Sequence, residues 1–278
     1  MNRPTSGARG NRLVEALSWV ALGWAAAGGA MAWTLDGASL GVGLAQQRWH
    51  EHTGTGNLPV SESGQGPVLA WGLQGQAGTL AGATLRWQLS GQGQQWASDY
   101  TGFKQYPDGS TQPWQQSNDW RSAQAMAQLE AAWPMRPGWQ LLLSGAVQTQ
   151  TQRRDLRQYR EHMRQHNALA GVGLQWQATP QWRWRVQALE PLSGASGARL
   201  SAPSLGFDAD IQARMSMRSL ELAWQPEASS PKPSRSEWVL RWQEQRTQWG
   251  ASTEVNAYVF PGAQQQQRTL TLGWVQRW

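Results

Sequence analysis

The feature that most constrains this chain is a strict alternation of apolar and polar side chains in segments about ten residues long. In the stretch "QWRWRVQALE", Trp182, Trp184 and Val186 alternate with Arg183 and Arg185. Successive side chains of a strand point to opposite faces, so this pattern predicts a strand with two different surroundings. What has to be decided is which face meets which surroundings.

Segments of this kind recur along the whole chain. Most are near or above the ~9–11 residues that a tilted strand needs to cross a bilayer. The chain has 20 Trp among 278 residues, which is not the composition of a disordered chain, although only 15% of its residues are charged. It contains at most one apolar run that approaches the length of a membrane helix. We predict ten strands, with eight or twelve as alternatives, at roughly 38–48, 66–76, 80–90, 119–131, 138–151, 168–178, 181–190, 209–224, 236–248 and 267–278.

The predicted connections alternate between short and long. The short side comprises residues 77–79, 133–137, 178–181 and 226–235, and the long polar loops fall at 49–65, 91–118, 152–167, 191–208 and 249–266. Short turns at one rim and long loops at the other are typical of a single antiparallel transmembrane β-barrel, with periplasmic turns and extracellular loops. We expect the barrel to span residues 33–278.

The first 32 residues predict a secretory signal peptide. Three arginines precede a largely apolar stretch, and Ala30-Met31-Ala32 is an A-x-A cleavage site. A single anchoring helix is the alternative, but the apolar core is short for a membrane span. The chain has no Cys, which excludes thiol catalysis and Cys-ligated metal centres.

Alternation alone also fits a soluble sandwich that buries its Trp face. Three observations favour a barrel with lipid against that face: Trp often lies near a segment end, Ala and Gly accompany it, and a signal peptide precedes the barrel. The opposite face then lines a narrow lumen that its own side chains fill. We expect a polar network there, with a small anion-favouring pore as the alternative. The residues assigned to the lumen are Arg86, Glu130, Arg183, Arg185, Arg214, Arg218 and Arg241.

Residues 209–224 do not keep one register. Ile211, Ala213, Met215 and Met217 share one face, whereas Leu220, Leu222 and Trp224 share the other. A β-bulge near residues 218–219 would place all of them on the lipid side.

The last ten residues, "TLTLGWVQRW", place Trp274 and Trp278 on one face of the final strand. With the signal peptide and the ten amphipathic segments, they resemble Gram-negative outer-membrane β-barrel proteins. The resemblance implies that the terminal aromatic residue is a signal read by the barrel assembly machinery, after transport by periplasmic chaperones. It covers the whole predicted mature chain as a pattern, and it names no activity.

The size also resembles the omptin proteases and the OpcA-type adhesins, both ten-stranded. Omptins use an Asp pair and an Asp–His pair at the outer rim. Here His50-Glu51-His52 and Asp208-Ala209-Asp210 lie on predicted loops, but their order and spacing do not match that arrangement. No catalytic residue is therefore assigned, and a rim-sited hydrolase acting on peptide or lipid stays an alternative.

The basic stretch 153–166, "RRDLRQYREHMRQH", is the sharpest local feature. Arg153, Arg157, Arg160 and Arg164 lie on one stripe if the stretch is a helix, and extended strands are the alternative. A solvated basic loop would account for the charge, but guanidinium groups also match phosphate oxygens in pairs. We therefore predict an anion-binding loop.

A metal site is not predicted, although His162 and His166 have helical zinc spacing, because a third ligand is lacking. No cofactor and no nucleic-acid partner is expected. The sequence thus predicts a non-enzymatic outer-membrane surface protein, structural or adhesive, that binds anions such as lipopolysaccharide at 153–166. A small channel and a rim-sited hydrolase are the alternatives.

Overall fold

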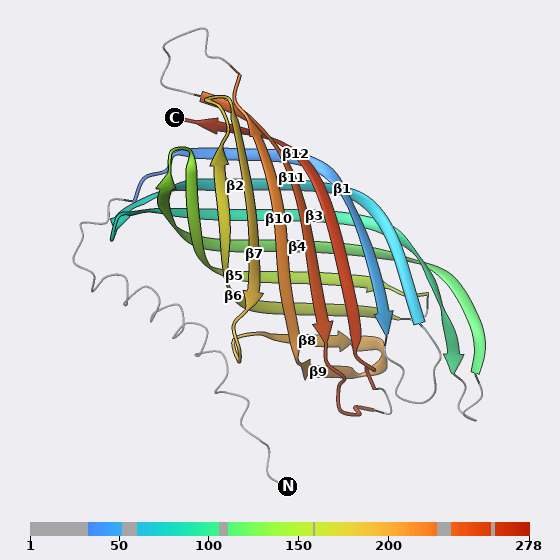
Figure 1. Ribbon diagram of the computed structural model, residues 1–278. Helices are drawn as coiled ribbons and strands as arrows, with labels where there is room; N and C mark the ends of the chain where they lie inside the picture. The colour runs from blue at the N-terminus through green and yellow to red at the C-terminus, as the bar shows by residue number, and fades with distance from the viewer. Residues whose placement is uncertain (1–32, 52–59, 106–110, 158, 227–234, 257–258) are drawn as a thin grey trace.

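The computed structural model describes residues 33–51, 60–105, 111–157, 159–226, 235–256 and 259–278. The strands run side by side as long ribbons (Figure 1). They are β1 Gly37–Glu51, β2 Val60–Leu80, β3 Ala83–Gln105, β4 Thr111–Arg136, β5 Trp139–Asp155, β6 Arg160–Gln177, β7 Trp182–Pro191, β8 Gly197–Ala202, β9 Phe207–Ile211, β10 Ala213–Trp224, β11 Arg235–Trp249 and β12 Ala263–Arg277, with a 3-10 turn, η1, at Pro203–Leu205.

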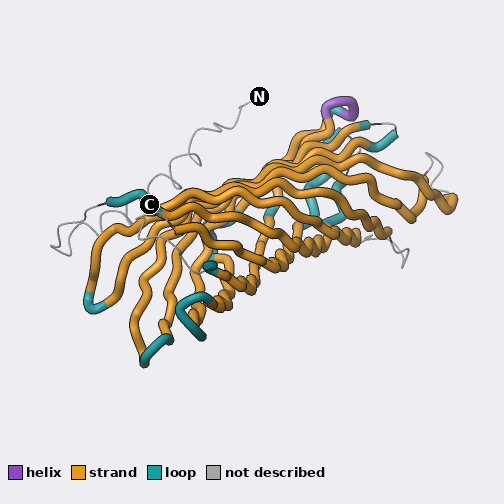
Figure 2. Tube along the Cα trace, turned by 90° about the horizontal axis from the view of Figure 1, so that it is seen from above, coloured by secondary structure: helices purple, strands orange, loops and turns teal. Residues whose placement is uncertain are grey.

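The strands close into one antiparallel ring. β12 pairs with β1, and β5 pairs with β6, so the sheet has no free edge along this circuit. The order around the ring is β5-β4-β3-β2-β1-β12-β11-β10-β7-β6. These are ten strands, and the prediction of a ten-stranded antiparallel barrel is confirmed. Seen at right angles, strand occupies most of the described chain, with short turns between (Figure 2).

β8 and β9 extend this ring at one end. β6 pairs with β7 through residues 169–177 and with β8 through residues 162–166. β8 therefore continues the direction of β7 after an interruption at residues 192–196, and β9 leads into β10 with Gln212 between them. The twelve labelled strands thus fill ten positions in the wall.

The two ends of the barrel differ, and we name them by their connections. The short-turn rim carries the tight turns Ala81–Gly82 and Pro137–Gly138, the start of β1 and the end of β12. Ala81 and Gly82 both have positive φ, at 46° and 79°, as a two-residue hairpin turn requires. This turn lies a few residues after the predicted 77–79. The long-loop rim carries the β5–β6 and β8–β9 tips, at the opposite end of the ribbons in Figure 1.

Several strands are longer than the sequence predicted. Residues 91–105 pair with residues 111–125 as the upper parts of β3 and β4, and residues 152–155 pair with 160–163 in β5 and β6. The predictions of long loops at 91–118 and 152–167 were therefore largely wrong. Bilayer thickness sets a minimum strand length, but backbone pairing continues beyond it wherever the alternation continues.

The outer wall carries an apolar belt. Val42, Leu272, Leu240 and Leu222 are register partners on four neighbouring strands and face outward together. Half or more of Val42 and Leu272 is exposed. The neighbouring Thr271, on the same strand, is buried inside. An apolar outside around a polar inside is the arrangement of a membrane barrel.

Most of the described tryptophans fall into two groups, which the sequence did not separate. Around the short-turn rim, indoles face outward and form a girdle. At the long-loop rim Trp49, Trp96, Trp120 and Trp249 point inward and are almost fully buried with Phe260. The girdle comprises Trp33, Trp87, Trp133, Trp139, Trp176, Trp182, Trp224, Trp238, Trp274 and Trp278.

The prediction that a bulge brings all apolar residues of 209–224 to the lipid side was wrong. β10 pairs with β7 and with β11 without any register shift, so there is no bulge at residues 218–219. Met215 and Met217 are buried inside with Leu169 and Leu189, where the lumen is locally apolar. Arg214 and Arg218, which the sequence assigned to the lumen, are exposed on the outer wall.

Within the described residues, no helix is long and apolar enough to cross a membrane. The predicted signal peptide at residues 1–32 lies outside the described part of the chain.

Candidate functional site

The basic stretch forms the upper ends of β5 and β6 and the tip between them. Residues 153–155 and 160–166 are extended strand, so the helical interpretation was wrong and the strand alternative is confirmed. Arg153 faces outward from β5, and Arg160 and Arg164 face outward from β6 with His162 between them. Arg157 is exposed at the tip. The outward arginines therefore lie on one surface of the wall.

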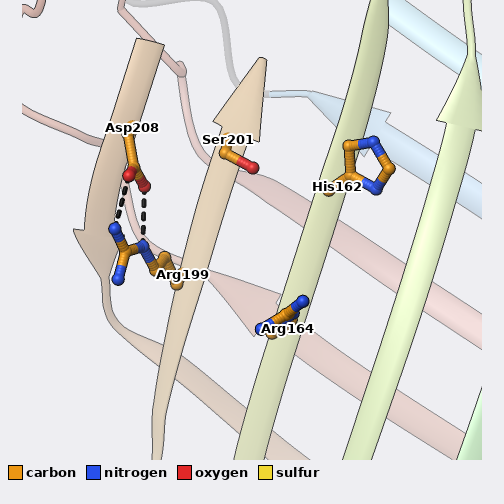
Figure 3. Close-up of a pocket in the computed structure, with 5 residues that line it drawn as sticks. All are labelled: His162, Arg164, Arg199, Ser201 and Asp208. Carbon is orange, nitrogen blue, oxygen red and sulfur yellow. Dashed lines mark hydrogen bonds and ion pairs between the residues drawn. The ribbon is translucent and has the colours of Figure 1, made fainter. Parts of the chain in front are cut away.

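Neighbouring strands enlarge this surface. Arg121 of β4 is the register partner of Arg153, and Arg199 of β8 is the partner of Arg164. Ser201 of β8 lies opposite His162 (Figure 3). We call this surface the hairpin patch, and it comprises Arg121, Arg153, Arg160, His162, Arg164, Arg199 and Ser201.

Two cavities open on the hairpin patch. One, of about 480 Å³, is lined by His162, Arg164, Arg199, Ser201 and Asp208 (Figure 3). The other, of about 340 Å³, lies beside it over β4, β5 and β6 and shares His162 and Arg164. Both are recesses of the outer wall rather than parts of the lumen, since most of their lining side chains face outward.

Some guanidinium groups of the patch are paired with carboxylates and others are not. Arg153 Nη2 lies 2.8 Å from Asp155 Oδ2, and Arg160 pairs with the same carboxylate. Arg199 holds both oxygens of Asp208. Arg121 and Arg164, in contrast, have no hydrogen-bond or ion-pair partner within the described ranges. These two cations are therefore free to meet an external anion.

His162 reports the positive potential of the patch. Its pKa is lowered, first by partial burial and then by the neighbouring guanidinium groups of Arg153 and Arg160. Both effects disfavour the charged imidazolium. An anion bound here would stabilise the imidazolium and raise the pKa of His162.

The height of the patch matches the upper edge of the apolar belt. On β6 the outward residues run from Trp176 through Leu174 and Val172 to two alanines, and then to His166 and Arg164. The twelve residue steps from Arg164 to Trp176 span roughly 40 Å along the strand, or about 30 Å along the barrel axis after a ~40° tilt. An apolar band is about 25 Å tall. The Arg164 guanidinium therefore lies just beyond the band, at the level of lipid headgroups.

The structure does not assemble the residues of the hydrolase alternative. His50 faces outward from β1, whereas Asp208 and Asp210 lie on β9, and β12 and β11 stand between β1 and the strand that β9 leads into. His162, Ser201 and Asp208 share one cavity, but Arg199 occupies the Asp208 carboxylate. His52 lies outside the described residues. Among the residues that are described, no cluster of three or more His, Asp or Glu is arranged to hold a metal ion.

Five of the seven residues assigned to the lumen lie inside the barrel near the short-turn rim, and Arg214 and Arg218 do not. The five are Arg86, Glu130, Arg183, Arg185 and Arg241. Arg86 Nη1 is 3.8 Å from Glu130 Oε1, and Arg185 pairs with the same carboxylate from the facing wall. Arg183 and Arg241 share Glu221, with Arg241 Nη2 at 2.7 Å from Oε2. Glu130 was the one carboxylate predicted in this network, and the inward Glu221 and Glu237 add two more.

The two residues of the predicted assembly signal lie at the short-turn rim. Trp274 is the partner of Trp238 and of Leu40 and faces outward. Trp278 donates its indole N–H to the carbonyl of Leu35 at 2.9 Å. This bond joins the last residue of the chain to the segment that enters β1.

The most consequential residue that the sequence analysis missed is Arg154. It is 2% exposed and points inward, where it contacts Glu51, Glu62 and Glu161. Arg121 and Arg199 were also missed. The alternation continues through all three positions, and following it beyond the expected strand ends would have assigned their faces.

The fold is that of outer-membrane β-barrel proteins. The outer membrane protease OmpT from Escherichia coli matches with a TM-score of 0.52 at 9% identity, over 89% of this chain and 99% of that chain. An outer membrane channel from Pseudomonas putida F1 gives a TM-score of 0.35 at 10% identity, over 90% and 98%. Neisserial surface protein A gives 0.26 at 11%, over 87% and 100%. No protein-family model and no curated protein matches the chain.

Proposed function

We propose that this protein is a non-enzymatic surface protein of a Gram-negative outer membrane, which binds phosphate-bearing anions such as lipopolysaccharide at its hairpin patch. The observation that carries the proposal is the pair of unpartnered guanidinium groups, Arg121 and Arg164, beside cavities on the outer wall. Arginine binds phosphate through paired, charge-assisted hydrogen bonds. Outer-leaflet headgroups supply phosphate at this height above the apolar belt.

The orientation follows from the two rims. The short-turn rim, with the Trp girdle, faces the periplasm, and the long-loop rim faces the outside. Cleavage of residues 1–32 leaves the mature chain beginning at Trp33, which packs beside Trp87 at the short-turn rim. Outer-membrane lipid is then the partner of the whole belt.

A conducting channel is the weaker proposal because side chains from facing walls meet across the lumen. Gln245 Nε2 donates to Gln150 Oε1 at 2.9 Å between β11 and β5, and Gln152 Nε2 donates to Gln265 Oε1 at 3.3 Å between β5 and β12. Above them Trp49 contacts Trp120, with ring centroids 5.6 Å apart. The interior is therefore occupied by hydrogen-bonded amides and aromatic rings at several levels.

The hairpin patch is tested by removing its free cations. In the double variant Arg121→Gln and Arg164→Gln, purified in detergent, we expect the Kd for lipopolysaccharide to rise about tenfold, or about 1.4 kcal/mol. The variant loses two charge-assisted contacts, and the effect should shrink in high salt. Lipid binding by native mass spectrometry gives the measurement.

A matched control removes the same charge from the other rim. Arg136→Gln with Arg235→Gln changes two exposed arginines of the short-turn rim and should leave the Kd unchanged. As a second readout, saturating lipopolysaccharide should raise the pKa of His162, because an anion stabilises the imidazolium, and affinity should then increase as the pH falls. An unchanged Kd in the hairpin-patch variant, or a His162 pKa that does not move, rules the site out.

The assembly role proposed for Trp278 predicts a difference between cells and purified protein. In Trp278→Ala we expect the amount inserted in the outer membrane to fall several-fold, since the machinery reads the terminal aromatic residue. The refolded variant in detergent should lose only about 1 kcal/mol, for one exposed hydrogen bond. Trp238→Ala removes an indole from the same girdle and is the control. Equal insertion of the two variants would contradict a role specific to the terminus.

A further inference from the structure

A second basic surface lies on the outer wall, away from the 153–166 hairpin. On β10, β11 and β12, Arg218, Glu244 and Arg268 are consecutive register partners. One step further from the belt, Arg246 of β11 and Arg48 of β1 flank Gln266 of β12 in the same way. We call this surface the seam patch, because it covers the β12–β1 closure, and it comprises Arg48, Arg214, Arg218, Glu244, Arg246 and Arg268.

The seam patch holds more net positive charge than the hairpin patch. It places five arginines around one carboxylate, Glu244. The hairpin patch also places five arginines outward, but Asp119 and Asp155 accompany them on β4 and β5, and Asp208 and Asp210 lie on the adjoining β9. The adjoining β7 adds one more outward carboxylate near the seam patch, Glu190. Even with Glu190, an anion meets a larger positive excess on β10–β12 and β1 than on the hairpin.

The internal ion pairs of the seam patch leave cations unused. Arg246 Nε lies 2.6 Å from Glu244 Oε1, and Arg268 Nε lies 2.9 Å from Glu244 Oε2. Both guanidinium groups thus close over one carboxylate, which is only 5% exposed. Arg48, Arg214 and Arg218 have no hydrogen-bond or ion-pair partner in the part of the chain that the structure describes. Three unpaired guanidinium groups therefore lie beside the two that Glu244 holds.

The wall directly beneath this row is apolar. Leu44, Leu270, Trp242 and Leu220 are register partners across the same four strands and face outward. They lie two residues along each strand from the charged row, or about 7 Å. Acyl chains fit against this ladder, while a headgroup attached to them reaches the arginines. A soluble anion would use only the upper part of the surface.

We propose that the seam patch is a binding site for a phosphorylated membrane lipid, whose phosphate is held by Arg48, Arg218 and their neighbours and whose chains lie on the Leu44–Leu220 ladder. The site shares the membrane location of the proposed function but does not depend on the hairpin patch. Its ligand arrives laterally through the outer leaflet. The seam and hairpin patches then hold lipid on two separate sectors of the wall.

The test uses the full protein in detergent, with bisphosphorylated lipid A as the probe and native mass spectrometry as the readout. We expect Arg48→Gln with Arg218→Gln to weaken lipid A binding about tenfold at one site, since neither residue supports a structural ion pair. The Arg136→Gln and Arg235→Gln control should bind as the wild type does. The seam and hairpin double variants combined should lose more than either alone.

Two further arms identify the ligand. Lipid A stripped of phosphate should not bind the seam patch, and inorganic phosphate at an equal phosphate concentration should not displace lipid A. The proposal is overturned if Arg48→Gln with Arg218→Gln binds like the control, if dephosphorylated lipid binds equally well, or if inorganic phosphate displaces the lipid. Loss of binding in the seam variant but not in the hairpin variant would support this site and reject the hairpin patch.

Discussion

Replacing Arg154 by leucine is expected to lower the free energy of unfolding by about 3–5 kcal/mol, because it leaves three carboxylates without their cation. The guanidinium lies among Glu51, Glu62 and Glu161, and Arg154 Nη1 is 3.0 Å from Glu51 and 3.1 Å from Glu161. Glu62 and Glu161 are 3% and 2% exposed, so water does not replace the lost partner. Buried unpaired charge is among the costliest changes in a protein interior.

The neighbouring residue is the matched control for this prediction. Arg153→Leu removes the same group one position earlier on β5. The Arg153 side chain faces outward, is 32% exposed and pairs with Asp155. An exposed pair contributes about 0–1 kcal/mol, so this variant should unfold almost as the wild type does. Urea unfolding in lipid vesicles compares the two.

A rescue variant separates charge from packing. Adding Glu62→Gln and Glu161→Gln to Arg154→Leu removes two of the uncompensated charges and should restore part of the lost stability. Arg154 also lies over aromatic rings, 5.4 Å from the Trp120 centroid, and that contact is not restored. If Arg154→Leu and Arg153→Leu lost the same stability, the buried cluster would not be the source of the effect.

The sequence predicted the barrel because the inside–outside alternation is a local property. Residues 80–90 and 181–190 have the expected phase, with Arg86, Arg183 and Arg185 inward and Trp182 outward. The strand count followed from the number of such segments. Pairing partners around the ring needed only the rule that consecutive antiparallel strands are neighbours.

The assumption that the apolar face of a strand points outward failed where the surroundings change along one strand. Outside the belt the outer wall meets water and the interior is packed, so apolar residues there face inward, as Trp49 and Trp120 do. In β10 the change occurs between Met217 and Leu220. The side chains go on alternating without a break, but the apolar residues are on the inner face before this point and on the outer face after it. A bulge was predicted because every apolar residue of the segment was assumed to face lipid.

The candidate site was predicted in part for a similar reason. Arg153, Arg160 and Arg164 share a surface in the barrel, although the helical spacing that first grouped them is not present. Arg121 and Arg199 reach the same surface only through the register of β4 and β8. Register between distant segments depends on the stagger of the closed ring, which one sequence does not reveal.

A charge placed in the middle of the belt is expected to destabilise the barrel strongly. Leu272 faces outward from β12 between Val42 and Leu240, in the apolar belt. An arginine on the lipid face near the bilayer midplane costs about 2–4 kcal/mol, and the cost falls to about 0–1 kcal/mol near the interface. Leu272→Arg should therefore lower the free energy of unfolding in vesicles by about 2–4 kcal/mol.

Gln264→Arg is the control, because it shows whether the cost of an arginine depends on its depth in the membrane. Residue 264 lies on the same face of the same strand, but beyond the arginine row, and it is exposed. Its replacement places the same guanidinium above the headgroups, where it should cost little. If hydrocarbon surrounds the belt, the two variants differ by more than 1 kcal/mol in vesicles. If water surrounded it, an arginine at either exposed position would be tolerated equally, and a similar stability for the two variants would reject the membrane orientation on which both lipid sites depend.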